Sequence, residues 1–109
     1  MPSVRVSYDP AARKFKFVPY ALQMDGPGIV VLTRHPGSAP WKFQTATFKD
    51  DSLEQFVVRD PGNGENLQID DKFLNVDPDI YYYTVTILLD TGEEITSPDP
   101  VIVNDPGDK

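Results

Sequence analysis

The stretch Ile80-Tyr81-Tyr82-Tyr83-Thr84-Val85-Thr86-Ile87-Leu88-Leu89 decides the fold class of this chain. β-Branched and aromatic residues fill it, and these residue types fit a pleated, half-buried surface. Apolar and aromatic side chains recur at every second position, which is the period of a β-strand. The segment therefore predicts one long strand that supplies the core from one face. The residues of that face are Tyr81, Tyr83, Val85, Ile87 and Leu89.

Shorter extended segments flank this strand along the chain. They include residues 3–8, 14–17, 29–33, 41–49, 93–97 and 101–103. Pro and Gly pairs separate them and favour turns over helices. About seven or eight short strands with frequent turns are typical of an antiparallel sandwich. We therefore expect an all-β chain: a single antiparallel, immunoglobulin-like β-sandwich domain over residues 1–109, with residues 104–109 as a flexible tail.

Two local patterns predict departures from regular strand pairing. The apolar phase changes between residues 43 and 46, which predicts a β-bulge near Gln44 or Thr45. Asp51 and Glu54 have the spacing of a helix capping box. Because a β-prone run follows directly, we expect at most one helical turn there.

The segment Asp77-Pro78-Asp79, just before the longest strand, resembles the tyrosine corner of immunoglobulin-like domains. In that motif a Tyr hydroxyl bonds back to the backbone a few residues upstream. Tyr81 or Tyr83 matches the position of that Tyr. The resemblance implies an immunoglobulin-like sandwich, although the usual Cys pair is missing and Trp41 would have to serve as the core Trp.

Asp-Pro pairs recur along the chain and mark several of its turns. The pairs are Asp9-Pro10, Asp60-Pro61, Asp77-Pro78, Asp99-Pro100 and Asp105-Pro106. Together with the C-terminal segment 97–106, they are similar to the small, functionally uncharacterised bacterial proteins grouped as the DP-EP family. This resemblance implies a compact bacterial β-sandwich, and it supplies no activity or catalytic residue.

The chain is acidic, with 17 Asp and Glu against 10 Lys and Arg and a formal net charge of −7 at pH 7. A phosphate backbone or an anionic membrane would repel it, so we expect neither nucleic acid nor a membrane as partner. The absence of Cys excludes disulfides and thiolate metal centres. No secretory signal or apolar membrane span is visible, so we expect a cytoplasmic protein.

Charge is divided unevenly along the sequence. Residues 1–49 hold seven basic groups against two acidic ones, whereas residues 50–109 hold three against 15. These charges either mix on one surface or meet across a weak homodimer. In the dimer interpretation, the basic strands of one copy contact the acidic last hairpin and tail of another, and the basic residues are Arg5, Arg13, Lys14 and Lys16.

Calcium is the metal for which the sequence offers candidate ligands. Asp60, Asn63 and Glu65 supply oxygens from a Gly-rich turn. A solvated turn uses the same residue types, so both interpretations stay open. We expect no other cofactor, and we interpret His35, the one His of the chain, as an exposed turn residue.

For function, we predict a non-catalytic interaction or structural domain with an unknown protein partner. The sequence shows no glycine-rich phosphate loop, nucleophile motif or His cluster. The first alternative is a carbohydrate-binding module that stacks sugars on Trp41 and Tyr82. The second is an enzyme that uses an N-terminal Pro2 as general base in tautomerase-like chemistry, although this chain lacks the helices of those enzymes.

Overall fold

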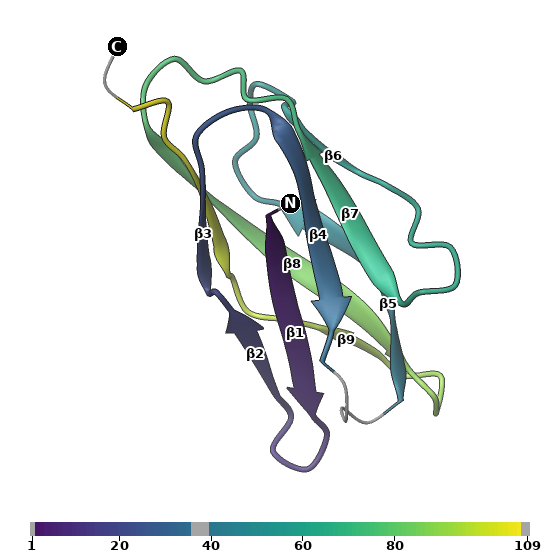
Figure 1. The fold of residues 1–109 in the computed structure, drawn as a ribbon. Coiled ribbons are helices and arrows are strands. Elements are labelled where there is room, and N and C mark those ends of the chain that lie inside the picture. The colour runs from purple at the N-terminus through teal and green to yellow at the C-terminus, as the bar shows by residue number, and fades with distance from the viewer. Residues whose placement is uncertain (1, 36–39, 108–109) are drawn as a thin grey trace.

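A computed structural model describes residues 2–35 and 40–107 of the chain. These residues form ten strands and no helix, so the all-β prediction is confirmed and the predicted number of strands was too low (Figure 1). In chain order the strands are β1 (Ser3–Asp9), β2 (Lys14–Val18), β3 (Ala21–Met24), β4 (Gly28–Arg34), β5 (Trp41–Phe48), β6 (Phe56–Val58), β7 (Asn66–Asp71), β8 (Asp79–Leu89), β9 (Glu94–Thr96) and β10 (Val101–Asn104). No described helix could cross a membrane.

The strands form two open sheets. One has the order β2-β1-β4-β7-β6, and the other has the order β3-β10-β8-β5 with β9 beside the far part of β8. The prediction of a purely antiparallel arrangement is wrong, because β1 runs parallel to β4 and β3 runs parallel to β10. Parallel neighbours need a crossover connection. For β1 and β4, strand β3 supplies it, since the chain leaves the first sheet after β2, passes through the second sheet and returns as β4.

The inner faces of the two sheets supply one apolar core. Tyr81, Tyr83, Val85 and Ile87 are all buried there, as the alternation in β8 predicts, and Leu89 packs against them partly buried. Side chains of β1, β4 and β7 meet them from the first sheet. Burial of this apolar surface is the main stabilising contribution to such a fold.

The predicted bulge is confirmed, because the register between β5 and β8 shifts between Phe43 and Thr45. The extra residue lets Phe43 and Ala46 both face the core. The expectation of at most one helical turn after β5 agrees with the structure, because the Glu54 N–H donates to the Asp51 carbonyl at 3.0 Å in a single turn and no helix follows. Both carboxylate oxygens of Asp51 accept backbone N–H groups, those of Gln55 and Phe56 at 3.0 Å, and close a loop that leads into β6.

The tyrosine corner is not formed in the way the sequence predicts. Tyr83 is fully buried, and its hydroxyl has no hydrogen-bond partner within residues 2–35 and 40–107. Among the described residues, no hydrogen bond joins the Tyr81 hydroxyl to the backbone upstream of it. The predicted tail is also shorter than expected, because Asn104 ends β10 and is buried.

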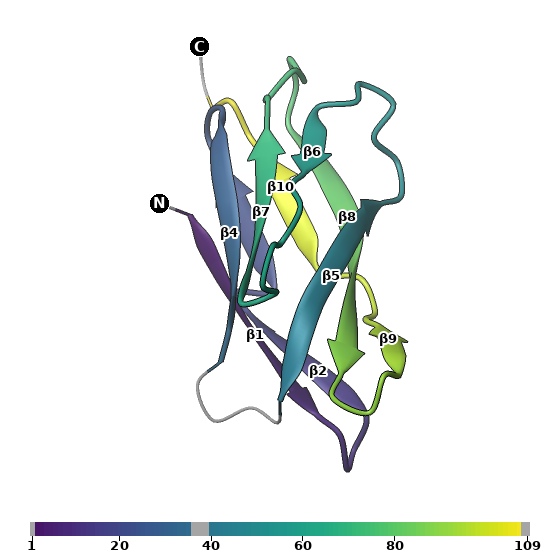
Figure 2. The same ribbon diagram turned by 90° about the vertical axis from the view of Figure 1, so that its right-hand side faces the viewer.

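The molecule is elongated, with principal extents of 48 × 23 × 22 Å. The loops after β3, β5 and β7 gather at one end, where β10 also terminates (Figures 1 and 2). Residues 49–55 and 72–78 form the two longer of these loops. This end therefore brings together segments that are distant in the sequence.

Candidate interaction site

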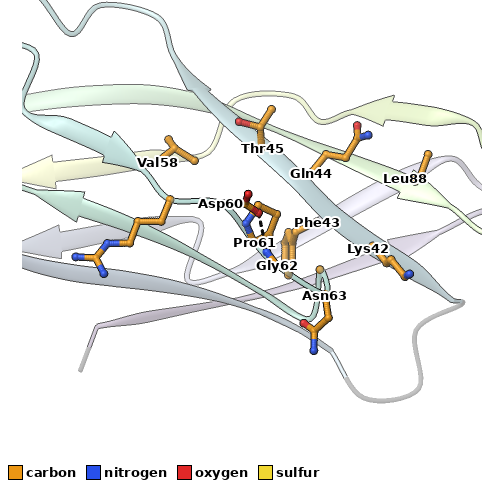
Figure 3. Close-up of a pocket in the computed structure, with 12 residues that line it drawn as sticks. Lys42, Phe43, Gln44, Thr45, Val58, Asp60, Pro61, Gly62, Asn63 and Leu88 are labelled. Carbon is orange, nitrogen blue, oxygen red and sulfur yellow. Dashed lines mark hydrogen bonds between the residues drawn. The ribbon is translucent and has the colours of Figure 1, made fainter.

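The turn between β6 and β7 holds the predicted calcium ligands and lines a hollow of about 500 Å³ (Figure 3). Asp60 Oδ1 accepts the Gly62 N–H at 2.9 Å, and Asn63 Oδ1 accepts the Glu65 N–H at 3.1 Å. These two bonds close Asx turns. Among the described residues, no group of three His, Cys, Asp or Glu side chains is placed to hold a metal ion. Asp60 and Asn63 thus each use one side-chain oxygen within the turn itself.

Gly64 allows this turn to pack closely against β5. Its φ is +84°, and an added Cβ would lie 2.5 Å from Cβ of Lys42. Its carbonyl accepts the N–H of Phe43 at 2.9 Å. A side chain at this position would separate the turn from the strand. The hollow in Figure 3 is thus lined by residues of the contact between the β6–β7 turn of the first sheet and β5 of the second sheet.

The predicted aromatic contact residues separate in the structure. Tyr82 is 47% exposed on the outer face of β8, as predicted. Trp41 is only 1% exposed and packs edge to face on Phe43, with ring centroids 4.8 Å apart. The proposed sugar platform therefore loses Trp41, because an apolar ring at the start of β5 faces the core.

The predicted basic contact residues lie on β1 and β2. Arg5 and Lys16 line one groove, while Lys14 lies opposite Asp9 in the strand pair. The hairpin that joins these strands reaches the last hairpin of the same chain through an Arg13–Glu93 ion pair at 3.0 Å. One chain thus makes part of the contact that the dimer interpretation places between two copies.

The loop-rich end of the molecule holds a second hollow, of about 450 Å³, which the sequence analysis missed. We call it the acidic-end hollow. No Lys, Arg or His is among its lining residues as far as the structure describes them. Its apolar lining residues are Leu53, Leu74, Val76 and Tyr81, and its acidic lining residues are Asp50, Asp77 and Asp79.

Large apolar side chains are exposed around this hollow. Val76 is 87% exposed, and Leu53 and Leu74 are about half exposed. An apolar patch with a polar rim typically marks an interaction surface. One signal in the sequence points to it: Phe73-Leu74-Asn75-Val76 is largely apolar but precedes a strong Asp-Pro turn. The structure places Phe73 and Leu74 in the loop between β7 and β8.

A polar cluster at the base of this loop consists of the buried residues Gln55, Asp71 and Asn104 and the half-buried Asn75. Asn104 Nδ2 is within donating distance of three oxygens: Asp71 Oδ1 at 3.0 Å, Asn75 Oδ1 at 3.1 Å and Gln55 Oε1 at 3.3 Å. Asn104 ends β10 in the second sheet, and Asp71 ends β7 in the first. The cluster therefore ties the two sheets together at the loop-rich end.

The polar cluster also fixes the loop that carries the exposed apolar residues. The N–H of Leu74 donates to Gln55 Oε1 at 2.8 Å, and that of Phe73 donates to Asp71 Oδ1 at 3.0 Å. The N–H of Lys72 donates to the Gln55 carbonyl at 2.9 Å. Three consecutive residues of the loop are thus held by buried groups. The acidic-end hollow is accordingly a positioned surface.

Three buried atoms of the polar cluster, Gln55 Nε2, Asp71 Oδ2 and Asn104 Oδ1, have no hydrogen-bond partner in the part of the chain that the structure describes. Burial raises the pKa of Asp71, and the nearby Asp51 carboxylate adds to this effect. Hydrogen bonds from Asn104 and from the Phe73 N–H act in the opposite direction. Unpartnered buried polar groups cost stability, and they concentrate at functional sites.

The Asp71→Asn variant is expected to gain stability over the parent chain as pH rises from acidic to neutral. In the folded parent, the pKa of Asp71 lies above its ordinary value of 3.8, so folding takes up a proton between the two values. The stability that Asp71 contributes is present below pH 3.8 and is lost as pH rises through the folded pKa. Because asparagine does not ionise, the Asp71→Asn variant does not lose this stability as pH rises.

Urea unfolding of both chains from about pH 3 to about pH 7 measures the difference. The variant Asp77→Asn, which removes an exposed carboxylate, controls for the change in net charge. A stability difference between Asp71→Asn and the parent that stays constant over this range would contradict the raised pKa.

The fold and this end of the molecule define the chain as an all-β protein of two open, mixed sheets with a positioned acidic and apolar surface. Comparison with protein-family models finds no family that matches the chain. No curated protein matches it either. A functional conclusion therefore rests on the geometry described above.

Proposed function

We propose that this chain is a non-catalytic interaction domain that binds a positively charged protein segment with apolar side chains at the acidic-end hollow. The observation that carries this proposal is Val76, which is 87% exposed in a loop held by buried hydrogen bonds. Exposure of a large apolar side chain to water is unfavourable, and a partner that covers the side chain removes this exposure. The hollow is the feature that such a partner would fill.

Charge favours one kind of partner. Asp50, Asp77 and Asp79 surround the apolar residues, and no basic side chain lines the hollow in the described structure. Complementary charge speeds association and suppresses binding of acidic partners. Leu74 and Val76 add the apolar contacts that supply affinity. A segment that alternates basic and apolar side chains matches both requirements.

We further propose that the fold is an immunoglobulin-like β-sandwich. Strands β4, β7 and β6 follow the order of strands B, E and D in that fold, and β5, β8 and β10 follow C, F and G. The parallel placement of β1 beside β4 and the absence of Cys are departures from the usual pattern. Membership of the DP-EP family, a cytoplasmic location and bacterial origin stay predictions.

The interaction proposal is tested with a short synthetic peptide of alternating lysine and leucine, titrated into the isotope-labelled full chain. We expect saturable NMR shifts in residues 49–55 and 72–79, and weaker binding at about 0.5 M salt because exposed charges are screened. Val76→Ser is expected to weaken binding about fivefold, since it removes roughly half of a buried Val contact.

Val57→Ser is the control, because Val57 is another exposed valine, at 41%, but lies on β6 outside the hollow. It is expected to leave peptide binding unchanged. Equal loss of binding in the two serine variants, or equally tight binding of a glutamate–leucine peptide, would overturn the proposal.

A further inference from the structure

A groove of about 270 Å³ lies on the outer face of the first sheet, on strands β1 and β2 and the end of β4. We call it the basic groove. Its lining residues are Arg5, Ser7, Lys16, Val18 and His35. No carboxylate is among them in the described structure, although the chain has 17 acidic residues.

Strand register places the polar groups of the groove in a row. Ser7 lies directly opposite Lys16 in the antiparallel pair of β1 and β2. On its other side, the N–H of His35 donates to the Val6 carbonyl at 2.8 Å and continues the parallel pairing of β4 with β1. His35 therefore lies beside Ser7. Side chains opposite one another in a sheet have Cβ atoms about 5 Å apart.

Arg5 adds a second cation to this row. It precedes Ser7 by two residues on the same strand, so both side chains stand on the outer face, and Arg5 lies opposite Val18. Burial confirms this orientation, because Val4 and Val6, which alternate with Arg5, are fully buried. A guanidinium, an ammonium, a hydroxyl and an imidazole thus converge on one small groove.

The cations of the basic groove differ from other basic residues of the chain. Arg13, Lys49 and Arg59 each pair with a carboxylate. Within residues 2–35 and 40–107, neither Arg5 nor Lys16 forms an ion pair. Two neighbouring cations repel each other, and an anion bound between them offsets this repulsion.

We propose that the basic groove binds a phosphate group, either free phosphate or a phosphomonoester. A tetrahedral oxyanion has several oxygens, and it accepts hydrogen bonds from Arg5, Lys16 and the Ser7 hydroxyl at the same time. The guanidinium of Arg5 suits a bidentate contact with two of these oxygens. This site is separate from the acidic-end hollow and does not depend on the proposed function.

NMR titration of the full chain with inorganic phosphate, and separately with phosphoserine, tests the proposal at constant ionic strength. We expect saturable shifts at residues 5–7, 16–18 and 35. Lys16→Gln is expected to weaken binding about fivefold, because it removes one charge-assisted hydrogen bond from an exposed site. Tighter binding of phosphoserine identifies a phosphorylated partner, and tighter binding of phosphate identifies the free ion; both results support the site.

Lys14→Gln is the matched control. Lys14 stands two residues before Lys16 on the same strand and face, lies opposite Asp9, and is outside the groove. The two variants change net charge equally, so only the groove distinguishes them. Equal weakening in both variants, or shifts spread over the whole surface without saturation, would overturn the proposal in favour of diffuse charge attraction.

Discussion

A chain that carries Val85→Asp is expected to be unfolded at room temperature. Val85 is fully buried in the middle of β8, opposite Ala46 of β5. An unpaired carboxylate there costs several kcal/mol, either as a buried charge or as a proton taken up at neutral pH. The whole free energy of unfolding of a domain this size is about 5–15 kcal/mol. One substitution therefore removes enough stability to unfold the chain.

The neighbouring residue provides the control for this experiment. Thr84 lies on the opposite face of β8, partly exposed and across from Thr47. Thr84→Asp introduces the same carboxylate on a face that water reaches, and it is expected to cost about 1 kcal/mol through lower strand propensity. Far-UV circular dichroism and the dispersion of amide NMR signals report folding of both variants. Equal folding of both variants would show that the inner face of β8 is not the core.

The core of this protein could be predicted because its signal is local. In β8 the side chains alternate strictly, and the fold buries the predicted face. The bulge in β5 was visible for the same reason, as a change of phase within one strand. Strand β3 was missed because Ala21–Met24 is short and contains a single clear apolar alternation.

Strand direction could not be predicted, because it depends on partners that are distant in the sequence. Val101 pairs with Ala21, and Ser3 pairs with Val31, both in parallel. In a hairpin the turn fixes the register of the two strands. No turn connects these parallel strands, so the sequence carries no local signal of their register. The same reason hides the Arg13–Glu93 pair, which joins two hairpins of one chain that are distant in the sequence.

The candidate site was missed for a related reason. Asn104 precedes an Asp-Pro pair near the C-terminus, and by composition such a segment is typical of a tail. Its partners Gln55 and Asp71 lie 49 and 33 residues away along the chain. Burial of a polar residue is decided by such distant partners, and a single sequence does not show them. The only local signal of this site in the sequence is the apolar pair Leu74 and Val76 just before an Asp-Pro turn.

Asn104→Ala is expected to lower the free energy of unfolding by about 3 kcal/mol. The side-chain amide is the donor that Asp71, Gln55 and Asn75 share, and it is buried. Alanine leaves these acceptors without that donor and leaves a space in a well-packed joint. Asn75 Oδ1 then loses its donor, while Asp71 Oδ1 and Gln55 Oε1 keep only the N–H groups of Phe73 and Leu74. Urea unfolding measures the change.

Asn75→Ala separates the role of Asn104 from that of the cluster as a whole. Asn75 is only half buried. Its removal takes away one acceptor of Asn104 and the Nδ2 donor to the carbonyls of Asp77 and Asn104, while the Asn104 side-chain bonds to Gln55 and Asp71 stay. We expect it to cost about 1 kcal/mol.

Hydrogen exchange then tests whether the polar cluster positions the surface. The amides of Phe73 and Leu74 donate to Asp71 and Gln55, the acceptors that Asn104 orients. In Asn104→Ala these two amides are expected to exchange faster, by more than the drop in global stability accounts for. If they exchange at the rate that global unfolding sets, Asn104 stabilises the fold without positioning the loop. The exposed apolar surface would then depend on Asp71 and Gln55 alone, because they bind the loop directly.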